Sequence, residues 1–211
     1  LIDGGTARGT TAVADGDGVL INDAGTMRQT NVTTLATYMG TKITGGSMVY
    51  LASTGAISNA ANVSFTQFDA SKYDHYEFWL QNVVPASDNQ TLECRVSTNG
   101  GSNYDSTNGN YHEAPIANKT GLTVAGSVGS DSGDYGISGT FQLFAPHNAN
   151  TFTMARSNMV YNHYGDALRI GLFTQASQHI TAQDVDAVQF VFNSGNIESG
   201  EIVMYGLANG S

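Results

Sequence analysis

The stretch that decides the fold is Tyr73–Gln81, which reads YDHYEFWLQ. Its apolar residues Tyr76, Phe78 and Leu80 occupy every second position. Successive side chains of a β-strand point to opposite faces, so this period of two predicts a strand with one buried face. The second face carries polar residues together with one large aromatic residue, Trp79.

The same period of two recurs along the rest of the chain, between turns rich in Gly, Asn and Ser. The predicted faces are Leu92, Cys94 and Val96; Phe141 and Leu143; Leu168, Ile170 and Leu172; Val188, Phe190 and Phe192; and Val203, Tyr205 and Leu207. No amphipathic helix stands between these strands, which argues against a parallel α/β sheet. About eight strands separated by turns predict an all-β fold, an antiparallel jelly-roll-like β-sandwich.

The N-terminal part has a different pattern. Val19–Ile21 and Thr26–Gln29 predict a hairpin around a polar turn, and Val32–Met39 carries apolar residues at helical spacing. A hairpin and one helix bury too little to fold alone. We therefore expect an anchoring arm over residues 1–45, which packs on another chain, and a sandwich domain over residues 46–211.

Charge excludes some classes of partner. The chain has 8 Lys and Arg against 18 Asp and Glu, which gives a net charge of −10. Eight cations are too few to form a basic patch that neutralises many phosphates. We therefore expect no nucleic-acid partner. No run of apolar residues is long enough for a transmembrane helix, so we expect no membrane partner. Cys94 is the only cysteine and is predicted to be a small buried hydrophobe.

No pattern of ionisable residues has the spacing of a catalytic, metal or cofactor site. Asp15–Gly18 and Asp131–Asp134 carry oxygen ligands that suit calcium, but turn chemistry explains both segments better. Glu198 and Glu201 are placed at a hairpin tip rather than in an acid–base pair. The five histidines show no zinc-binding spacing, although three could converge in space: His75, His112, His147, His163 and His179. We expect no enzyme, no metal and no cofactor.

Aromatic residues are the remaining candidates for a binding site. Trp79 shares its strand face with His75 and Glu77, and a tryptophan flanked by polar groups can stack on a sugar ring. The competing and favoured interpretation is that this face packs on the other sheet or on a neighbouring subunit. Tyr104 and Tyr111, in or near loops, are weaker candidates for glycan binding.

Several stretches also resemble a known family. The segments Tyr73–Phe78, Leu80–Ala86 and Arg95–Asp105 together resemble a recurrent block in virion structural proteins of tailed bacteriophages. The ending, Phe192–Leu207, resembles the last strands of the same domains. The stretch Ala14–Tyr38 resembles an N-terminal segment of phage fibre-like proteins.

The resemblance implies a jelly-roll-like domain, usually trimeric, displayed on a phage head or tail and without a catalytic motif. The first hypothesis is therefore a non-enzymatic virion protein, of the fibre, spike or capsid-decoration type, on the virion surface. It would act in assembly and in adhesion to a host-surface glycan, as a homotrimer whose arm binds other virion proteins. The alternative is a carbohydrate-binding module or lectin of the same architecture. A polysaccharide-degrading enzyme is the least favoured class, because a carboxylate pair is missing.

Overall fold

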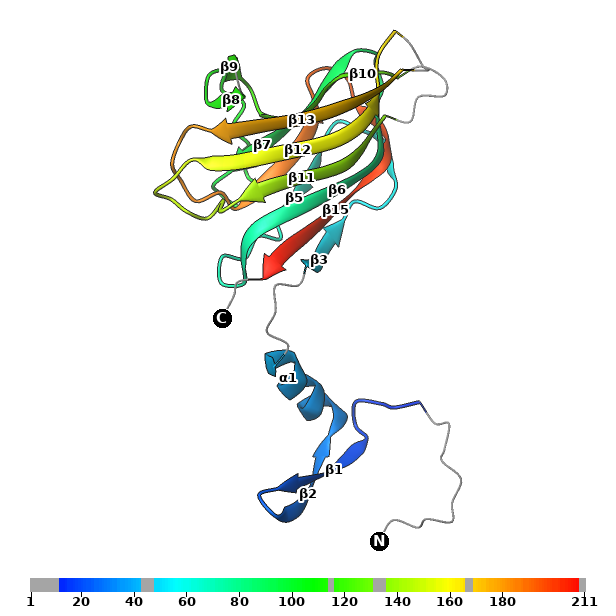
Figure 1. Cartoon of the computed structure of the whole chain (residues 1–211), viewed down its shortest axis with the longest axis vertical. Coiled ribbons are helices and arrows are strands. Elements are labelled where there is room, and N and C mark those ends of the chain that lie inside the picture. Colours follow the sequence, from blue (N-terminus) through cyan, green and yellow to red (C-terminus); the bar gives the residue numbers. More distant parts are fainter. Residues whose placement is uncertain (1–11, 43–47, 114–115, 131–135, 166–168, 209–211) are drawn as a thin grey trace. The chain divides into compact units, whose positions relative to one another are not determined.

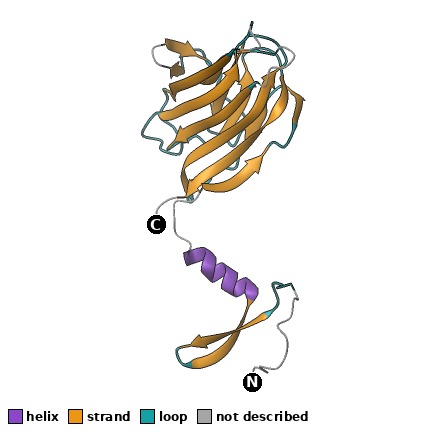
Figure 2. Ribbon diagram, turned by 45° about the vertical axis from the view of Figure 1, so that its right-hand side comes forward, coloured by secondary structure: helices purple, strands orange, loops and turns teal. Residues whose placement is uncertain are grey.

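The computed structural model describes residues 12–42, 48–113, 116–130, 136–165 and 169–208. Contacts divide the chain into two compact units, one reaching Gly45 and one beginning at Gly46. Each unit has its own secondary structure (Figures 1 and 2). Two segments that the sequence singled out, Leu168 and Asp131–Asp134, lie outside the described residues.

The first unit is a hairpin followed by a helix. Strands β1 (Gly18–Asp23) and β2 (Thr26–Asn31) pair antiparallel, and α1 (Val32–Lys42) follows directly. The helix is capped by Asn31, whose Oδ1 accepts the backbone N–H of Thr34 at 2.8 Å. Such a cap satisfies one of the N–H groups that a helix leaves open at its start. The predicted hairpin-plus-helix arm is therefore confirmed in its elements.

The second unit consists of strands. They are β3 (Met48–Ser53), β4 (Ile57–Ala60), β5 (Val63–Phe65), β6 (Tyr73–Pro85), β7 (Gln90–Ser97), β8 (Tyr111–Glu113), β9 (Ile116–Lys119), β10 (Leu122–Val128), β11 (Ile137–Phe144), β12 (Thr153–Asn162), β13 (Ile170–His179), β14 (Ala187–Phe192) and β15 (Ile197–Ala208).

These strands form two antiparallel sheets, seen as two layers in Figure 1. The larger sheet has the order β3-β15-β6-β11-β12-β13-β8-β9, with β4 also pairing β15. The smaller sheet has the order β10-β7-β14-β5. The strands β3-β15-β6-β11 and β5-β14-β7-β10 have the strand order of a jelly roll, in which the chain repeatedly crosses between sheets. The β12–β13 hairpin and the β8–β9 hairpin widen the larger sheet. The predicted antiparallel jelly-roll-like sandwich is confirmed.

An aromatic cluster fills the space between the two sheets. Phe78 and Phe141 come from the larger sheet, Phe65 and Phe190 from the smaller one, and each is at most 2% exposed. Phe190 lies 5.1 Å from Phe78, 5.9 Å from Phe141 and 6.1 Å from Phe65, measured between ring centroids. Inclined rings at these distances are favourable beyond the area that they bury. Tyr76 and Leu80 are buried on the same face of β6, as the alternation predicts.

The interior holds other residues that the sequence placed there. Cys94 is fully buried, and burial raises the pKa of its thiol well above the ordinary value. It is thus a packing residue, as expected. Ile170 and Leu172 do share a face of β13, but that face points outward, and they are 78% and 73% exposed. Period two alone does not say which face of a strand is covered.

We predict that Phe190→Ala lowers the free energy of unfolding by about 3–5 kcal/mol, because it removes the ring that joins three others between the sheets. Phe152→Ala is the matched control: Phe152 lies just before β12, is 47% exposed, and its loss should cost less than about 0.5 kcal/mol. Urea unfolding of the full-length chain, followed by circular dichroism, measures both. Equal losses in the two variants would contradict a core centred on Phe190.

Candidate functional site

Three aromatic side chains form a row across the outer face of the larger sheet, and they are called the aromatic row below. They are Tyr50 on β3, Tyr205 on β15 and Trp79 on β6, three strands that pair in that order. The ring centroids of Trp79 and Tyr205 lie 5.9 Å apart, and those of Tyr205 and Tyr50 lie 6.1 Å apart. Trp79 is 48% exposed and Tyr50 is 60% exposed. The smaller sheet covers the opposite face of β6, where Phe78 contacts Phe190, so the expectation that the Trp79 face packs on the other sheet is wrong. The other form of that interpretation, packing on a neighbouring subunit, stays a prediction.

Glu77 fixes the polar groups beside the aromatic row. Its Oε1 accepts the indole N–H of Trp79 at 2.6 Å, and its Oε2 accepts an amide N–H of Gln142 at 2.8 Å. Trp79 is two residues along β6, and Gln142 is opposite Glu77 on β11. Hydrogen bonds to a carboxylate are shorter and stronger than those between neutral groups. A single carboxylate therefore orients an exposed ring and an amide on neighbouring strands.

A hollow of about 330 Å³ adjoins Glu77 on this face. His75 on β6, Phe144 on β11 and Leu207 on β15 lie in register across it, and Met48 and Gln142 also line it. The hollow has a mostly apolar lining with a few polar groups, which is the usual make-up of a small-molecule site. Glu77 connects the hollow with the aromatic row, because it lines the hollow, is the partner of Tyr205 in the β15–β6 register and binds the indole of Trp79.

The ring of His75 adds a hydrogen-bond donor to the hollow. Its Nδ1 accepts a hydrogen bond from the backbone N–H of Ala145, and the two nitrogen atoms are 3.1 Å apart. In the neutral ring the proton must then be on Nε2, which is left to donate. The polar side chains among the lining residues are thus the imidazole of His75, the amide of Gln142 and the carboxylate of Glu77. Glu77 is the one carboxylate among its lining residues, so it has no partner there for paired acid–base work.

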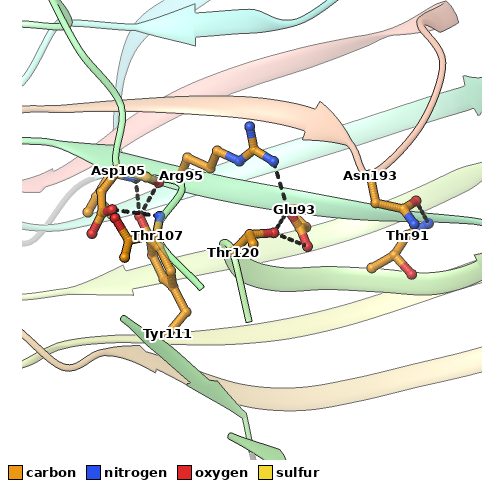
Figure 3. Close-up of polar contacts among 9 residues, drawn as sticks. Thr91, Glu93, Arg95, Asp105, Thr107, Tyr111, Thr120 and Asn193 are labelled. Carbon is orange, nitrogen blue, oxygen red and sulfur yellow. Dashed lines mark hydrogen bonds and ion pairs between the residues drawn. The ribbon is translucent and has the colours of Figure 1, made fainter. Parts of the chain in front are cut away.

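Tyr111 is not part of this face, and its proposed role as a sugar platform is wrong. Its side chain is fully buried. The hydroxyl donates to the backbone oxygen of Asp105 at 2.8 Å and accepts the N–H of Val96 at 3.1 Å (Figure 3). Burial raises the pKa of Tyr111 far above the ordinary value. A ring without an exposed face cannot stack on a ligand.

Tyr104 is half-buried in the loop that follows β7, beside a polar recess that also includes Asn99 and Asn103. This loop extends from the smaller sheet, whereas Trp79 lies on the outer face of the larger one. The structure therefore does not bring Tyr104 together with Trp79. Of the three aromatic candidates, Trp79 alone joins a face with convergent polar groups.

Asp105 anchors this loop, a role that the sequence did not reveal. Its carboxylate accepts hydrogen bonds from the N–H of Thr107 at 2.8 Å, from Asn110 at 2.8 Å and from His179 Nε2 at 2.9 Å. Burial alone would raise the pKa of Asp105, but these hydrogen bonds outweigh it and lower the pKa to about 2. His179 is fully buried at the end of β13, with its ring 4.8 Å from Tyr111. The loop is thereby fastened to the larger sheet.

One carboxylate is buried without a signal in the sequence. Glu93 on β7 is 6% exposed. The hydroxyl of Thr120 donates to its carboxylate and lies 3.0 Å from Oε1 and 2.9 Å from Oε2 (Figure 3). Arg95 Nη2 lies 3.3 Å from the same carboxylate. Alternation along β7 predicts only that Glu93 and Arg95 face away from Cys94. The neighbouring segment around Thr120 then covers them.

Two acidic candidates remain. Glu198 and Glu201 were expected at a hairpin tip, but both lie within β15, where Glu201 Oε1 accepts the hydroxyl of Ser53 at 2.5 Å. The other candidate, Asp15–Gly18, forms a turn that leads into β1. The Oδ2 of Asp17 accepts the N–H of Ala14 at 2.8 Å, and the backbone oxygen of Asp15 accepts the N–H of Thr33 at 3.3 Å. Within the described ranges, no three His, Cys, Asp or Glu side chains lie together as metal ligands. Likewise, no helix of the described segments is long and apolar enough to cross a membrane.

Comparisons with protein-family models, with curated proteins and with solved structures found no match to this chain.

We predict that Asp105→Asn makes the fold less stable at neutral pH, by about 1–3 kcal/mol, since a carboxylate that accepts three hydrogen bonds is lost. The folded pKa of about 2 lies below the reference value of 3.8. The contribution of Asp105 is thus complete above pH 4 and disappears as the pH falls towards 2. In thermal melts from pH 7 to pH 2, the melting temperature of Asp105→Asn should fall less with pH than that of the parent chain. Asp74→Asn, at an exposed position of β6, is the control, and parallel curves for Asp105→Asn and the parent would contradict the assignment.

Proposed function

We propose that this chain is a non-enzymatic structural protein of a tailed-phage virion, of the fibre, spike or capsid-decoration type. Its jelly-roll domain would be displayed on the particle surface, and its arm would hold it there. The observation that carries the proposal is the contrast between the two units. One has a closed aromatic core, and the other has no buried side chain among its described residues.

The exposed apolar residues of the arm support an anchoring role. Leu20 on β1 is 58% exposed, Met27 on β2 is 62% exposed and Met39 on α1 is 52% exposed. Apolar residues distributed over a small unit without a core indicate a surface that another chain covers. In the proposal the arm packs on two further copies of this chain and on another virion protein.

Two further observations support the class of non-enzymatic virion protein. The phage-like stretches quoted above cover nearly all of β6 and β15, which pair with each other between β3 and β11 in the larger sheet. The hollow beside Glu77 holds one carboxylate, which supports display rather than glycan hydrolysis. The alternative, an independent carbohydrate-binding module or lectin, needs no arm with exposed apolar residues, so the arm favours the virion role.

The test is incorporation into particles. A full-length tagged copy, supplied during infection by the phage that encodes the chain, should co-purify with virions, and its mass in solution should correspond to three copies. A chain that lacks residues 1–45 should keep its β-domain folded, as judged by circular dichroism, but should be absent from particles. Full-length Trp79→Ala is the control and should still be incorporated.

The proposal fails if the full-length chain is a stable monomer absent from virions. It also fails if the truncated chain is incorporated as well as the parent, since the arm would then have no anchoring role.

A further inference from the structure

We propose that the outer face of β3, β15, β6 and β11 binds a neutral glycan. A pyranose ring would stack on Trp79, and its hydroxyl groups would bind in the hollow beside Glu77, His75 and Gln142. The inference goes beyond the proposed virion role, because it assigns a ligand class to a particular face and holds for the purified chain whether or not the chain is part of a virion.

Trp79 has the exposure and the fixed orientation that stacking requires. About half of the side chain is exposed, and the indole N–H is held by Glu77 Oε1 at 2.6 Å. The face of an aromatic ring carries a partial negative charge, which attracts the partly positive C–H groups on the apolar side of a pyranose. Because the ring is already held in place, little side-chain entropy is lost when a sugar binds.

The polar groups suit hydroxyls. An ionised carboxylate has about four acceptor positions, and the bonds from Trp79 and Gln142 leave positions on Glu77 open. Gln142 retains a second N–H and its carbonyl oxygen, and His75 retains Nε2. A sugar hydroxyl both donates and accepts, so neighbouring hydroxyls can pair with this mixture of donors and acceptors on two adjacent strands.

The charge on the face favours a neutral glycan over an acidic one. Glu77 is central to the site, and the whole chain carries a net charge of −10. A uronic or sialic acid carboxylate would therefore be repelled. Arg156 is the cation closest in the register. It is opposite Gln142 on β12, one strand beyond the hollow. Acidic glycans are thus the informative comparison.

The inclination of the rings narrows the ligand further. The planes of Trp79 and Tyr205 are inclined by 57°, and those of Tyr205 and Tyr50 by 77°. Coplanar rings would suit the flat surface of a crystalline polysaccharide. Inclined rings next to a hollow instead suit a single sugar ring at the end or at a bend of a soluble glycan.

Trp79 is the only tryptophan of the chain, so its fluorescence reports on this face alone. The full-length protein is titrated with neutral oligosaccharides built from glucose, galactose, mannose and N-acetylhexosamines, and with sialyllactose and oligogalacturonates as acidic probes. We expect saturable binding of at least one neutral probe, a shift of the emission to shorter wavelength and protection from quenching by acrylamide.

Variants then connect the signal to the proposed contacts. Gln142→Ala should weaken binding about tenfold, as expected for the loss of one or two hydrogen bonds. Trp79→Ala, followed by calorimetry, should show no detectable binding of the same probe. Phe152→Ala removes an aromatic ring of nearly equal exposure, 47% against 48%, and should bind like the parent. Circular dichroism confirms that each variant is folded.

Three results would overturn the inference. The first is that no neutral probe binds, or that only acidic probes do. The second is that Trp79→Ala binds like the parent. The third is that Trp79 is inaccessible to acrylamide in the free protein and that Trp79→Ala dissociates an oligomer, which would make this face a subunit interface. Glycan binding by a chain that is absent from virions would refute the virion role alone, and incorporation without glycan binding would refute the glycan site alone.

Discussion

The contact between Phe78 and Phe190, 5.1 Å between ring centroids, joins the two sheets of the jelly roll. Phe78 belongs to β6, at the centre of β3-β15-β6-β11, and Phe190 belongs to β14, inside the smaller sheet. Because this contact places Tyr76, Phe78 and Leu80 inside, the alternate residues of β6 must face outward. His75, Glu77 and Trp79 reach the surface for that reason. The candidate site is thus a direct consequence of the core.

Strand order then adds the other members of the site. Since β15 pairs with both β3 and β6, Tyr205 lies between Tyr50 and Trp79. Since β11 pairs with the other edge of β6, Gln142 comes within 2.8 Å of Glu77. Strands in a sheet are about 4.8 Å apart, so side chains from neighbouring strands on one face meet without any loop. A site built on paired strands is more rigid than one built on loops.

The two units differ in what stabilises them. The β-domain buries an aromatic core and has internal anchors such as Asp105, which holds Thr107, Asn110 and His179. The arm has backbone pairing and a capped helix, but its apolar side chains stay exposed. Hydrogen-bonded backbone without buried apolar area is marginal in water. This difference is the physical reason for the proposal that one unit is displayed and the other attaches.

The amino-acid sequence by itself determined the local features. Period two in Tyr73–Gln81 identified the strand and its inward residues, the isolated Cys94 was correctly placed in the core, and the hairpin and the helix of the arm followed from turn chemistry and helical spacing. These features depend only on neighbours along the chain, whose geometry is nearly fixed by the backbone.

Only the tertiary structure decided which faces are covered. Ile170 and Leu172 share a face, as their spacing predicts, yet that face is exposed, while Tyr111 and Glu93 are buried. The pairing of Asp105 with His179 joins residues 74 positions apart. Alternation specifies which side chains lie together on a strand, but the cover on each face depends on sheet order and on the crossing of the chain between sheets. Sheet order and chain crossings depend on contacts between residues far apart in the sequence, so they give no local pattern. Tyr50, Tyr205 and Trp79 could therefore be recognised as one surface only in the folded chain.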